Sequence, residues 1–229
     1  MYSSYPQPSH PVTAVSASPP HNRPLIEVTG EGTVTAAPNR AVIVLGVITE
    51  SPQLSTAQSG NTAAVTQVIN ALLALGIPND HIQTVTYQIE PQYDFKDGSQ
   101  VFRGYRVTHL LQITLDRIDQ TGLVVDTAVR NGANTVSSVQ FTIANPGLAY
   151  NQALSAAIHQ AEGKARTVAA TLGVTLVRTP LKVTEETLAG GPPIPFKATL
   201  MAEGAAAPTP IQPGVLEIRA AVRVQYTYY

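Results

Sequence analysis

The chain has 229 residues, of which 44% are hydrophobic and only 13% are charged, with a formal net charge of −1 and no cysteine. This composition excludes disulfides, thiolate metal sites and cysteine nucleophiles, and the lack of any Lys or Arg block argues against nucleic-acid binding, which needs basic groups to neutralise phosphates. Ordinary soluble domains carry roughly 25% charged residues, about twice the fraction found here. The surface of this protein is therefore either rich in neutral polar groups or partly covered in an assembly.

The first 24 residues differ in composition from the rest. They contain six prolines and few large apolar side chains, so a disordered or extended arm is expected. The arm is either a linker without a role of its own or a segment that docks on a neighbouring subunit, with Tyr2 and Tyr5 as contacts. It has neither the basic start nor the continuous apolar stretch of a secretory signal peptide. The sequence therefore predicts a cytoplasmic chain that reaches a cell or spore surface only by another route.

Residues 25–229 are predicted to form one domain that starts with two strands and a helix. The strands cover residues 25–36 and 40–50 and are joined at the turn APN. The second contains AVIVLGVIT, which is apolar on both faces and is typical of a central strand covered on both sides. Apolar residues then recur at helical spacing over 54–75, and Gly76 is the expected stop.

A β-hairpin and a long helix dominate the rest of the domain. Strands over 82–93 and 102–115 flank the loop DFKDGSQ, which predicts the hairpin. A loop rich in Ala, Pro and Gly, residues 188–214, precedes the last strand, and loops of this length are usually functional or mobile. The order ββ-α-ββ-α-β-α-ββ predicts an α+β fold, with an antiparallel or mixed sheet and helices on one face. The remaining elements are a helix, a strand, the longest helix and two strands, over residues 120–131, 136–143, 148–172, 176–187 and 215–228.

Six segments carry a resemblance to a known family, in the family's order and at its separations. Over residues 25–228 the chain resembles the SIMPL-domain family of YggE-like proteins, which includes oxidative-stress and periplasmic-antigen types. The segments are IEVTGEGTVTAAPNRAVIVLGV (26–47), GIPNDHIQTVTYQIEPQYDF (76–95), GYRVTHLLQITL (104–115), GANTVSSVQFTI (132–143), AEGKARTVAATLGV (161–174) and APTPIQPGVLEIRAAVRVQYTY (207–228).

The resemblance implies an antiparallel sheet backed by helices and a tendency to form large ring- or channel-like homo-oligomers. Many members of the family are bacterial proteins exported to the periplasm or cell surface, with loose ties to oxidative-stress defence or kinase-pathway signalling. The family's signature has Asp after its first proline, where this chain has Asn39. The family defines no catalytic residues that could be carried over.

The titratable residues form no recognisable catalytic or metal-binding pattern. His109 has the strand parity of Leu111, which favours a core or interface histidine over a ligand. Two interpretations of Asp94 and Asp97 are open: they are paired carboxylates that perform acid–base chemistry or bind a cation, or they are turn residues followed by Gly98 at positive φ. The turn interpretation is favoured. No two of the five histidines pair at i,i+3 or i,i+4; they are His10, His21, His81, His109 and His159.

Other candidate motifs are equally weak. Glu185 and Glu186 are adjacent in a strand and point to opposite faces. The GEG at residues 30–32 and the GG at 190–191 lack phosphate-loop spacing. No run of about 18 apolar residues is present, so no transmembrane helix is expected. The sequence thus predicts no catalytic residue, cofactor or metal, and no enzyme.

Three hypotheses about function remain. The favoured one is a non-enzymatic, self-assembling structural protein that forms a homo-oligomeric ring, tube or filament. The alternatives are a binding module linked to stress defence or signalling, with residues 188–214 as a lid, and an enzyme of stress response or hydrolysis. Besides Tyr2 and Tyr5, the expected interface residues of the first hypothesis are Val42, Val44 and Ile48 of the two-faced strand and Ile194, Phe196, Leu200 and Met201 of the loop.

Overall fold

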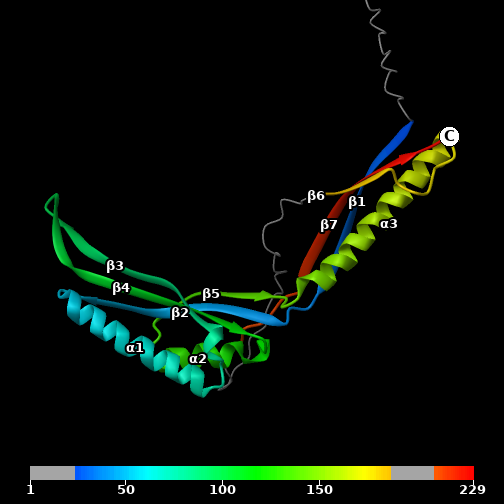
Figure 1. Ribbon diagram of the computed structural model, residues 1–229. Helices are drawn as coiled ribbons and strands as arrows, with labels where there is room; N and C mark the ends of the chain where they lie inside the picture. The colour runs from blue at the N-terminus through cyan, green and yellow to red at the C-terminus, as the bar shows by residue number, and fades with distance from the viewer. Residues whose placement is uncertain (1–23, 187–208) are drawn as a thin grey trace, which may run out of the picture.

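Two lobes joined at a bend make up the protein (Figure 1) in a computed structural model that describes residues 24–186 and 209–229. One lobe has a four-stranded sheet of order β3-β4-β2-β5, and the other has a three-stranded sheet of order β1-β7-β6. All the pairings between these strands are antiparallel. The elements in chain order are β1 (Leu25–Ala36), β2 (Arg40–Ser51), α1 (Leu54–Ala74), β3 (Ile82–Lys96), β4 (Ser99–Leu115), α2 (Thr121–Arg130), β5 (Thr135–Thr142), α3 (Pro146–Leu172), β6 (Lys182–Glu186) and β7 (Leu216–Thr227).

The α+β class, the element order and the β3–β4 hairpin are confirmed. The strands, however, are divided between two sheets, where the sequence suggested one. The division arises at the first turn: β1 pairs along its whole length with β7, from Leu25 opposite Thr227 to Ala36 opposite Leu216, while β2 enters the other sheet between β4 and β5. Periodicity identifies a strand but not its partner, which here comes from the far end of the chain.

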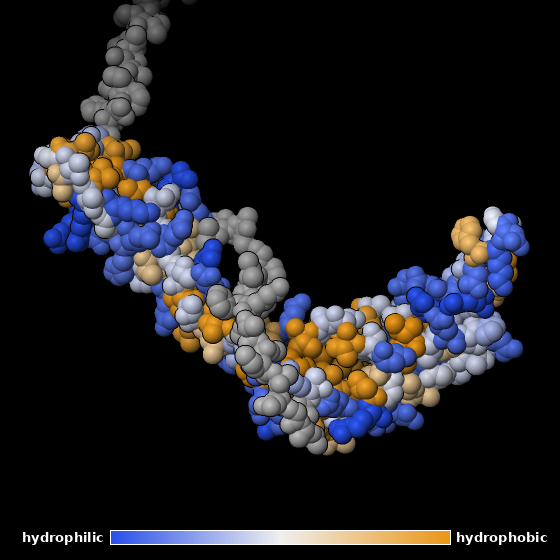
Figure 2. All heavy atoms as spheres, turned by 180° about the vertical axis from the view of Figure 1, so that it is seen from behind, coloured by the Kyte–Doolittle hydropathy of each residue, from blue (hydrophilic) through white to orange (hydrophobic). Residues whose placement is uncertain are grey.

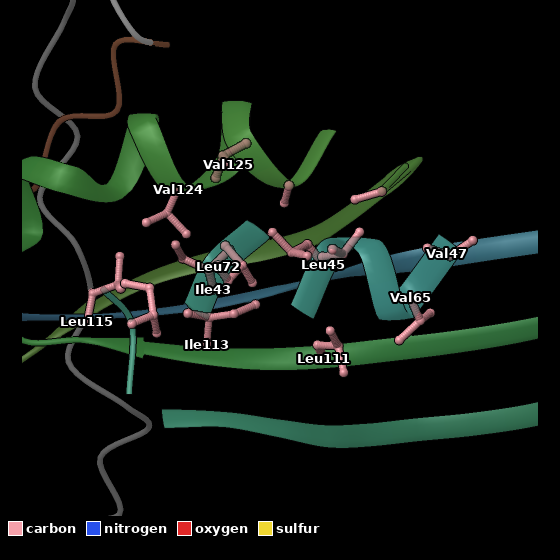
Figure 3. Close-up of a cluster of buried hydrophobic side chains, with 14 of the residues drawn as sticks. Ile43, Leu45, Val47, Val65, Leu72, Leu111, Ile113, Leu115, Val124 and Val125 are labelled. Carbon is pink, nitrogen blue, oxygen red and sulfur yellow. The ribbon is translucent and has the colours of Figure 1, made fainter. Parts of the chain in front are cut away.

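The main core lies between the four-stranded sheet and helices α1 and α2. Alternate residues of β2 are buried against these helices (Figure 3). The strand is central, between β4 and β5, as expected, but the expectation that it is covered on both sides is wrong for the described residues. The helices cover one face only, and Val42, Val44 and Ile48 are half-buried on the opposite face. The buried side chains that Figure 3 labels are Ile43, Leu45 and Val47 of β2, Leu111, Ile113 and Leu115 of β4, Val65 and Leu72 of α1, and Val124 and Val125 of α2.

The second core lies between α3 and the β1–β7 ribbon, and it is built from small residues. A Cβ at Gly30 would lie 2.0 Å from the carbonyl oxygen of Ala157, and one at Gly32 would lie 1.9 Å from that of Ala153. Four residues of helix advance about 6 Å and two residues of strand about 6.7 Å, so the two spacings match along the contact. The helix therefore lies directly on the strand backbone. Its buried alanines recur every four residues, at Ala153, Ala157, Ala161, Ala165 and Ala169.

Candidate functional site

The interface residues that the sequence predicted lie partly on the described chain. Val42, Val44 and Ile48 share the helix-free face of the four-stranded sheet, where their neighbours on β4 are mostly polar. Figure 2 shows apolar side chains gathered on the rear of this lobe. The other expected contacts lie outside the described residues: Tyr2, Tyr5, Ile194, Phe196, Leu200 and Met201. Most of the proposed lid, residues 188–214, lies outside them as well.

The most exposed cluster of large apolar side chains lies on the β3–β4 hairpin. We call it the hairpin ladder. Its β3 members occupy alternate positions and so share one face, and the register places Tyr93 opposite Phe102 of β4 on that face. The ladder consists of Tyr87, Ile89, Tyr93, Phe95 and Phe102, whose exposed fractions are 49%, 37%, 52%, 74% and 47%.

The ladder is exposed because the hairpin extends beyond the elements that cover its base. The neighbouring strand β2 ends at Ser51, opposite Tyr105, and α1 begins only at Leu54. Near the base, Gln58 of α1 donates a hydrogen bond to the Tyr87 hydroxyl at 3.2 Å. Beyond that point the described ranges place neither a third strand nor a helix against the hairpin, which projects from the lobe (Figure 1).

The aromatic rings of the hairpin hold one another in place. Tyr93 and Phe102 meet edge to face with ring centroids 5.8 Å apart, and Phe102 meets Tyr105 at 5.2 Å. Nearer the sheet, Tyr87 contacts the His109 ring at 5.2 Å in the same geometry. Edge-to-face pairs contribute about 0.5–1.5 kcal/mol beyond area burial, so the exposed rings are ordered before any partner arrives.

An ion-pair network fixes the base of the projecting hairpin. Glu50, at the end of β2, accepts hydrogen bonds from Arg103 at 2.6 Å and from Arg106 at 2.8 Å. The Arg106 hydrogen bond, with the charge of both arginines, holds the pKa of Glu50 below its ordinary value. The register shifts next to Gln92, and Gly104, with φ of +155°, lies so close to Ser51 that a Cβ would be 2.6 Å from its carbonyl oxygen. A small polar hollow of about 210 Å³ lies here.

The histidines are dispersed rather than brought together. His109 lies on the helix-facing side of β4, contacts Thr84 Oγ1 at 3.0 Å, and has a pKa lowered by its partial burial. His81 contacts the Thr114 carbonyl oxygen through Nδ1 at 2.9 Å, and His159 is exposed on α3, while His10 and His21 lie outside the described residues. Within residues 24–186 and 209–229, no group of three or more His, Asp or Glu side chains is placed to hold a metal ion.

The acidic candidates have structural partners. Asp97 and Gly98 have φ of +49° and +77° and form the hairpin turn, as the turn interpretation predicted. For Asp94 that interpretation was wrong, because this residue lies in β3 opposite Val101 and 4.0 Å from the Arg103 guanidinium. The two adjacent glutamates point to opposite faces of β6, because Glu185 accepts from the Tyr150 hydroxyl and Glu186 accepts from Arg223 on the other side at 2.7 Å. None of these carboxylates converges on another in a cleft.

Asn39, where the SIMPL signature has Asp, serves the connection between the lobes. Its side-chain oxygen accepts from the Ala144 N–H at 2.8 Å, and its own N–H donates to the Thr142 carbonyl oxygen at 3.1 Å. The position needs an acceptor rather than a charge, which an amide oxygen provides as well as a carboxylate.

Sequence reasoning missed the hairpin ladder, although its signal is visible in the segment TYQIEPQYDF. Apolar residues alternate strictly there from Tyr87 to Phe95, which normally indicates a buried face. The predicted strands also stopped at residue 93 and resumed at 102, whereas β3 continues to Lys96 and β4 begins at Ser99. Of the ladder, only Phe95 lies in these additional residues.

Comparison with known proteins gives consistent matches. The model of the SIMPL family, described as "Protein of unknown function (DUF541)", matches residues 26–226. The "26 kDa periplasmic immunogenic protein" of Brucella melitensis biotype 1 is 31% identical over 176 residues, which are 75% of this chain and 69% of that protein. The "Uncharacterized protein YggE" of Escherichia coli K12 is 29% identical over 143 residues, 61% of this chain and 58% of that protein.

These similarities correct the location predicted from the N-terminal sequence. A cytoplasmic protein was expected because residues 1–24 do not resemble a signal peptide, but the Brucella relatives are described as periplasmic. No helix of the described part combines the length and the apolar character needed to cross a bilayer.

Proposed function

The chain belongs to the SIMPL family, and from that premise we propose that it is a non-enzymatic structural protein of an extracytoplasmic compartment that assembles with copies of itself through the hairpin ladder. The location follows the relatives described as periplasmic. The absence of enzymatic activity is supported by titratable groups that are dispersed in the described residues and engaged in structural bonds.

The observation that carries this proposal is the concentration of exposed apolar surface on one hairpin. If an aromatic side chain presents about 200 Å², the exposed fractions of the four rings in the ladder correspond to roughly 450 Å². Patches of this size are among the largest on a typical monomer and often mark a contact site. Three of the rings, Tyr87, Tyr93 and Phe102, are also held by edge-to-face contacts, so they lose little conformational entropy when they are covered.

A second copy of the chain is the partner that this surface fits. Two ladders facing one another would cover roughly 900 Å², and flanking polar side chains would bring the total towards the roughly 1,200 Å² at which specific interfaces begin. The charged residues of β3 alternate with the ladder residues, so Glu90, Asp94 and Lys96 point to the opposite face of the hairpin. Two copies therefore meet without strong repulsion.

The hairpin favours contact through its side-chain face over strand addition or insertion into lipid. Pro91 lies in the middle of β3, the edge strand, and has no N–H to donate to an incoming strand. The turn at the tip, from Lys96 to Ser99, is polar and charged, which opposes end-on insertion into an apolar membrane. The half-buried Val42, Val44 and Ile48 lie on the opposite face of the same lobe as a further candidate contact.

Sedimentation velocity of the full chain tests the proposal. We expect an oligomer that forms between about 1 and 100 μM, which corresponds to association free energies of about −8 to −5.5 kcal/mol. Negative-stain microscopy of the same sample then distinguishes rings or tubes from small discrete assemblies. A monomer throughout this concentration range would overturn the proposal.

A further inference from the structure

The outer edge of β1 is closed by two side chains of α3. Strand β1 pairs with β7 on one side only and forms an edge of the three-stranded sheet. On its other side, Lys164 Nζ donates to the Thr29 carbonyl oxygen at 2.8 Å. The Glu31 N–H donates to Gln160 Oε1, also at 2.8 Å. These two backbone groups are ones that an incoming strand would bind.

The two caps match the edge in spacing and in chemistry. Gln160 and Lys164 are four residues apart on the helix, about 6 Å along its axis, and Thr29 and Glu31 are two apart on the strand, about 6.7 Å. An ammonium group can only donate and faces a carbonyl, whereas an amide oxygen accepts and faces an N–H. The side chains thus reproduce one donor and one acceptor of a neighbouring strand.

Apart from these caps and the charged side chains of Glu27 and Glu31, β1 has none of the usual protections of an edge strand. It runs for 12 residues without Pro or Lys, and its pairing with β7 has no register shift. The other edge strands differ: β6 has five residues, β5 pairs through an irregular register, and β3 contains Pro91 and two register shifts. A long, regular and unblunted edge is a template for pairing with another chain.

The edge is also accessible in space. An open groove of about 760 Å³ runs beside it, lined by Val28 and Thr29 of β1 and by Gly163 and Val168 of α3, among others. Gly163 contributes no side chain to the groove, and no atom lies within 4 Å of the position its Cβ would take. The helix body therefore leaves room for an extended backbone, and only the two caps occupy the edge.

We propose that the free edge of β1 is a strand-accepting surface for an extended segment of a second copy of this chain, and that Gln160 and Lys164 keep it closed. A second copy is the occupant because its β1 presents the same regular 12-residue edge, paired on one side only, and two such edges can pair antiparallel about a two-fold axis. This inference goes beyond the proposed function, since the edge lies in the other lobe and does not involve the hairpin ladder.

The test is the double variant Gln160→Ala/Lys164→Ala, made in a chain that already carries Tyr93→Ser and Phe95→Ser. Because the ladder is disabled in this parent, the result does not depend on whether the hairpin contact exists. We expect the weight-average mass from light scattering to rise about twofold over the parent at equal concentration, because the uncapped edge is free to pair with a second copy.

A matched control and a rescue make the outcome specific. Gln152→Ala/Arg166→Ala removes one amide and one cation from the same helix without touching β1, since Arg166 pairs with Glu162, and it should leave the mass unchanged. Gln160→Glu/Lys164→Arg keeps the acceptor and the donor and should also stay at the parent's mass. Unchanged mass in the double alanine variant, with native circular dichroism and a cooperative melt, would overturn the proposal. An equal mass gain in the matched control would do the same.

Discussion

Replacing two rings of the hairpin ladder gives a quantitative test of the proposed assembly. In the variant Tyr93→Ser/Phe95→Ser, the exposed fractions of 52% and 74% correspond to roughly 250 Å² of ring surface that a partner could cover. At about 25 cal/mol per Å², full burial of this surface would contribute roughly 6 kcal/mol. If a partner covers half of it, the loss is about 3 kcal/mol, and the dissociation constant rises roughly a hundredfold.

The folded state should tolerate these changes, because both side chains are largely in solvent. Tyr93→Ser removes the edge-to-face contact with Phe102, so the free energy of unfolding should fall by about 0.5–1.5 kcal/mol at most. Urea denaturation followed by circular dichroism is the check, and the midpoint should stay close to that of the wild type. The association constant is measured by sedimentation velocity across the concentration range in which the wild-type chain assembles.

Leu148→Ser is the matched control. Leu148 lies in the first turn of α3, in the other lobe, and is as exposed as Phe95, at 75%. The substitution removes a comparably exposed apolar side chain without touching the hairpin, so it should leave the association constant unchanged. The reasoning is refuted if the ladder variant assembles within about threefold of the wild type, which is less than 1 kcal/mol, or if Leu148→Ser weakens assembly as much.

Three further predictions concern stability. Gly32→Ala should lower the free energy of unfolding by about 3 kcal/mol, because its methyl group would overlap the Ala153 carbonyl. Gly163→Ala, in contrast, should raise it by about 0.5–1 kcal/mol. Urea denaturation compares the two variants, and equal effects would contradict the packing argument. Burial lowers the pKa of His109 below 6.5, so below that pH the unfolded chain binds more protons than the folded one, and the protein should lose stability as the pH falls. In thermal melts of His109→Gln, the melting temperature should depend less on pH in this range. An unchanged pH dependence would exclude His109 as its source. Glu50→Gln should speed amide hydrogen exchange in the projecting hairpin at pH 7. The difference from the wild type should shrink below pH 4.5, because the Glu50 carboxylate, with its lowered pKa, becomes protonated there. Exchange rates equal to those of the wild type at pH 7 would show that the ion pairs do not hold the hairpin.

The sequence predicted the elements well because their signals are local. The longest helix was expected over residues 148–172, and α3 ends at Leu172, before Gly173 with φ of +70°. The last strand was expected over residues 215–228, and β7 covers Leu216–Thr227. Each of these inferences needs only neighbouring residues.

What the sequence did not predict depends on contacts between distant segments. The division into two sheets follows from pairing residues 25–36 with 216–227, which no local pattern specifies. The exposure of the ladder depends on where α1 begins relative to the end of the hairpin. The GEG segment was judged as a phosphate loop and set aside, but its glycines match the four-residue alanine spacing of α3. That relation is visible only when both segments are considered together.

The alanine contact of α3 also determines how this lobe can change in length. At 100° per residue, each buried alanine lies about 40° further round the helix than the previous one, so the row winds by about 160° between Ala153 and Ala169. The β1–β7 ribbon must twist along with it for all five to stay buried. A single-residue insertion in α3 would turn everything after it by about 100° and expose the row. Homologues with a longer or shorter lobe are therefore expected to differ by four residues in α3 together with two in β1 and two in β7.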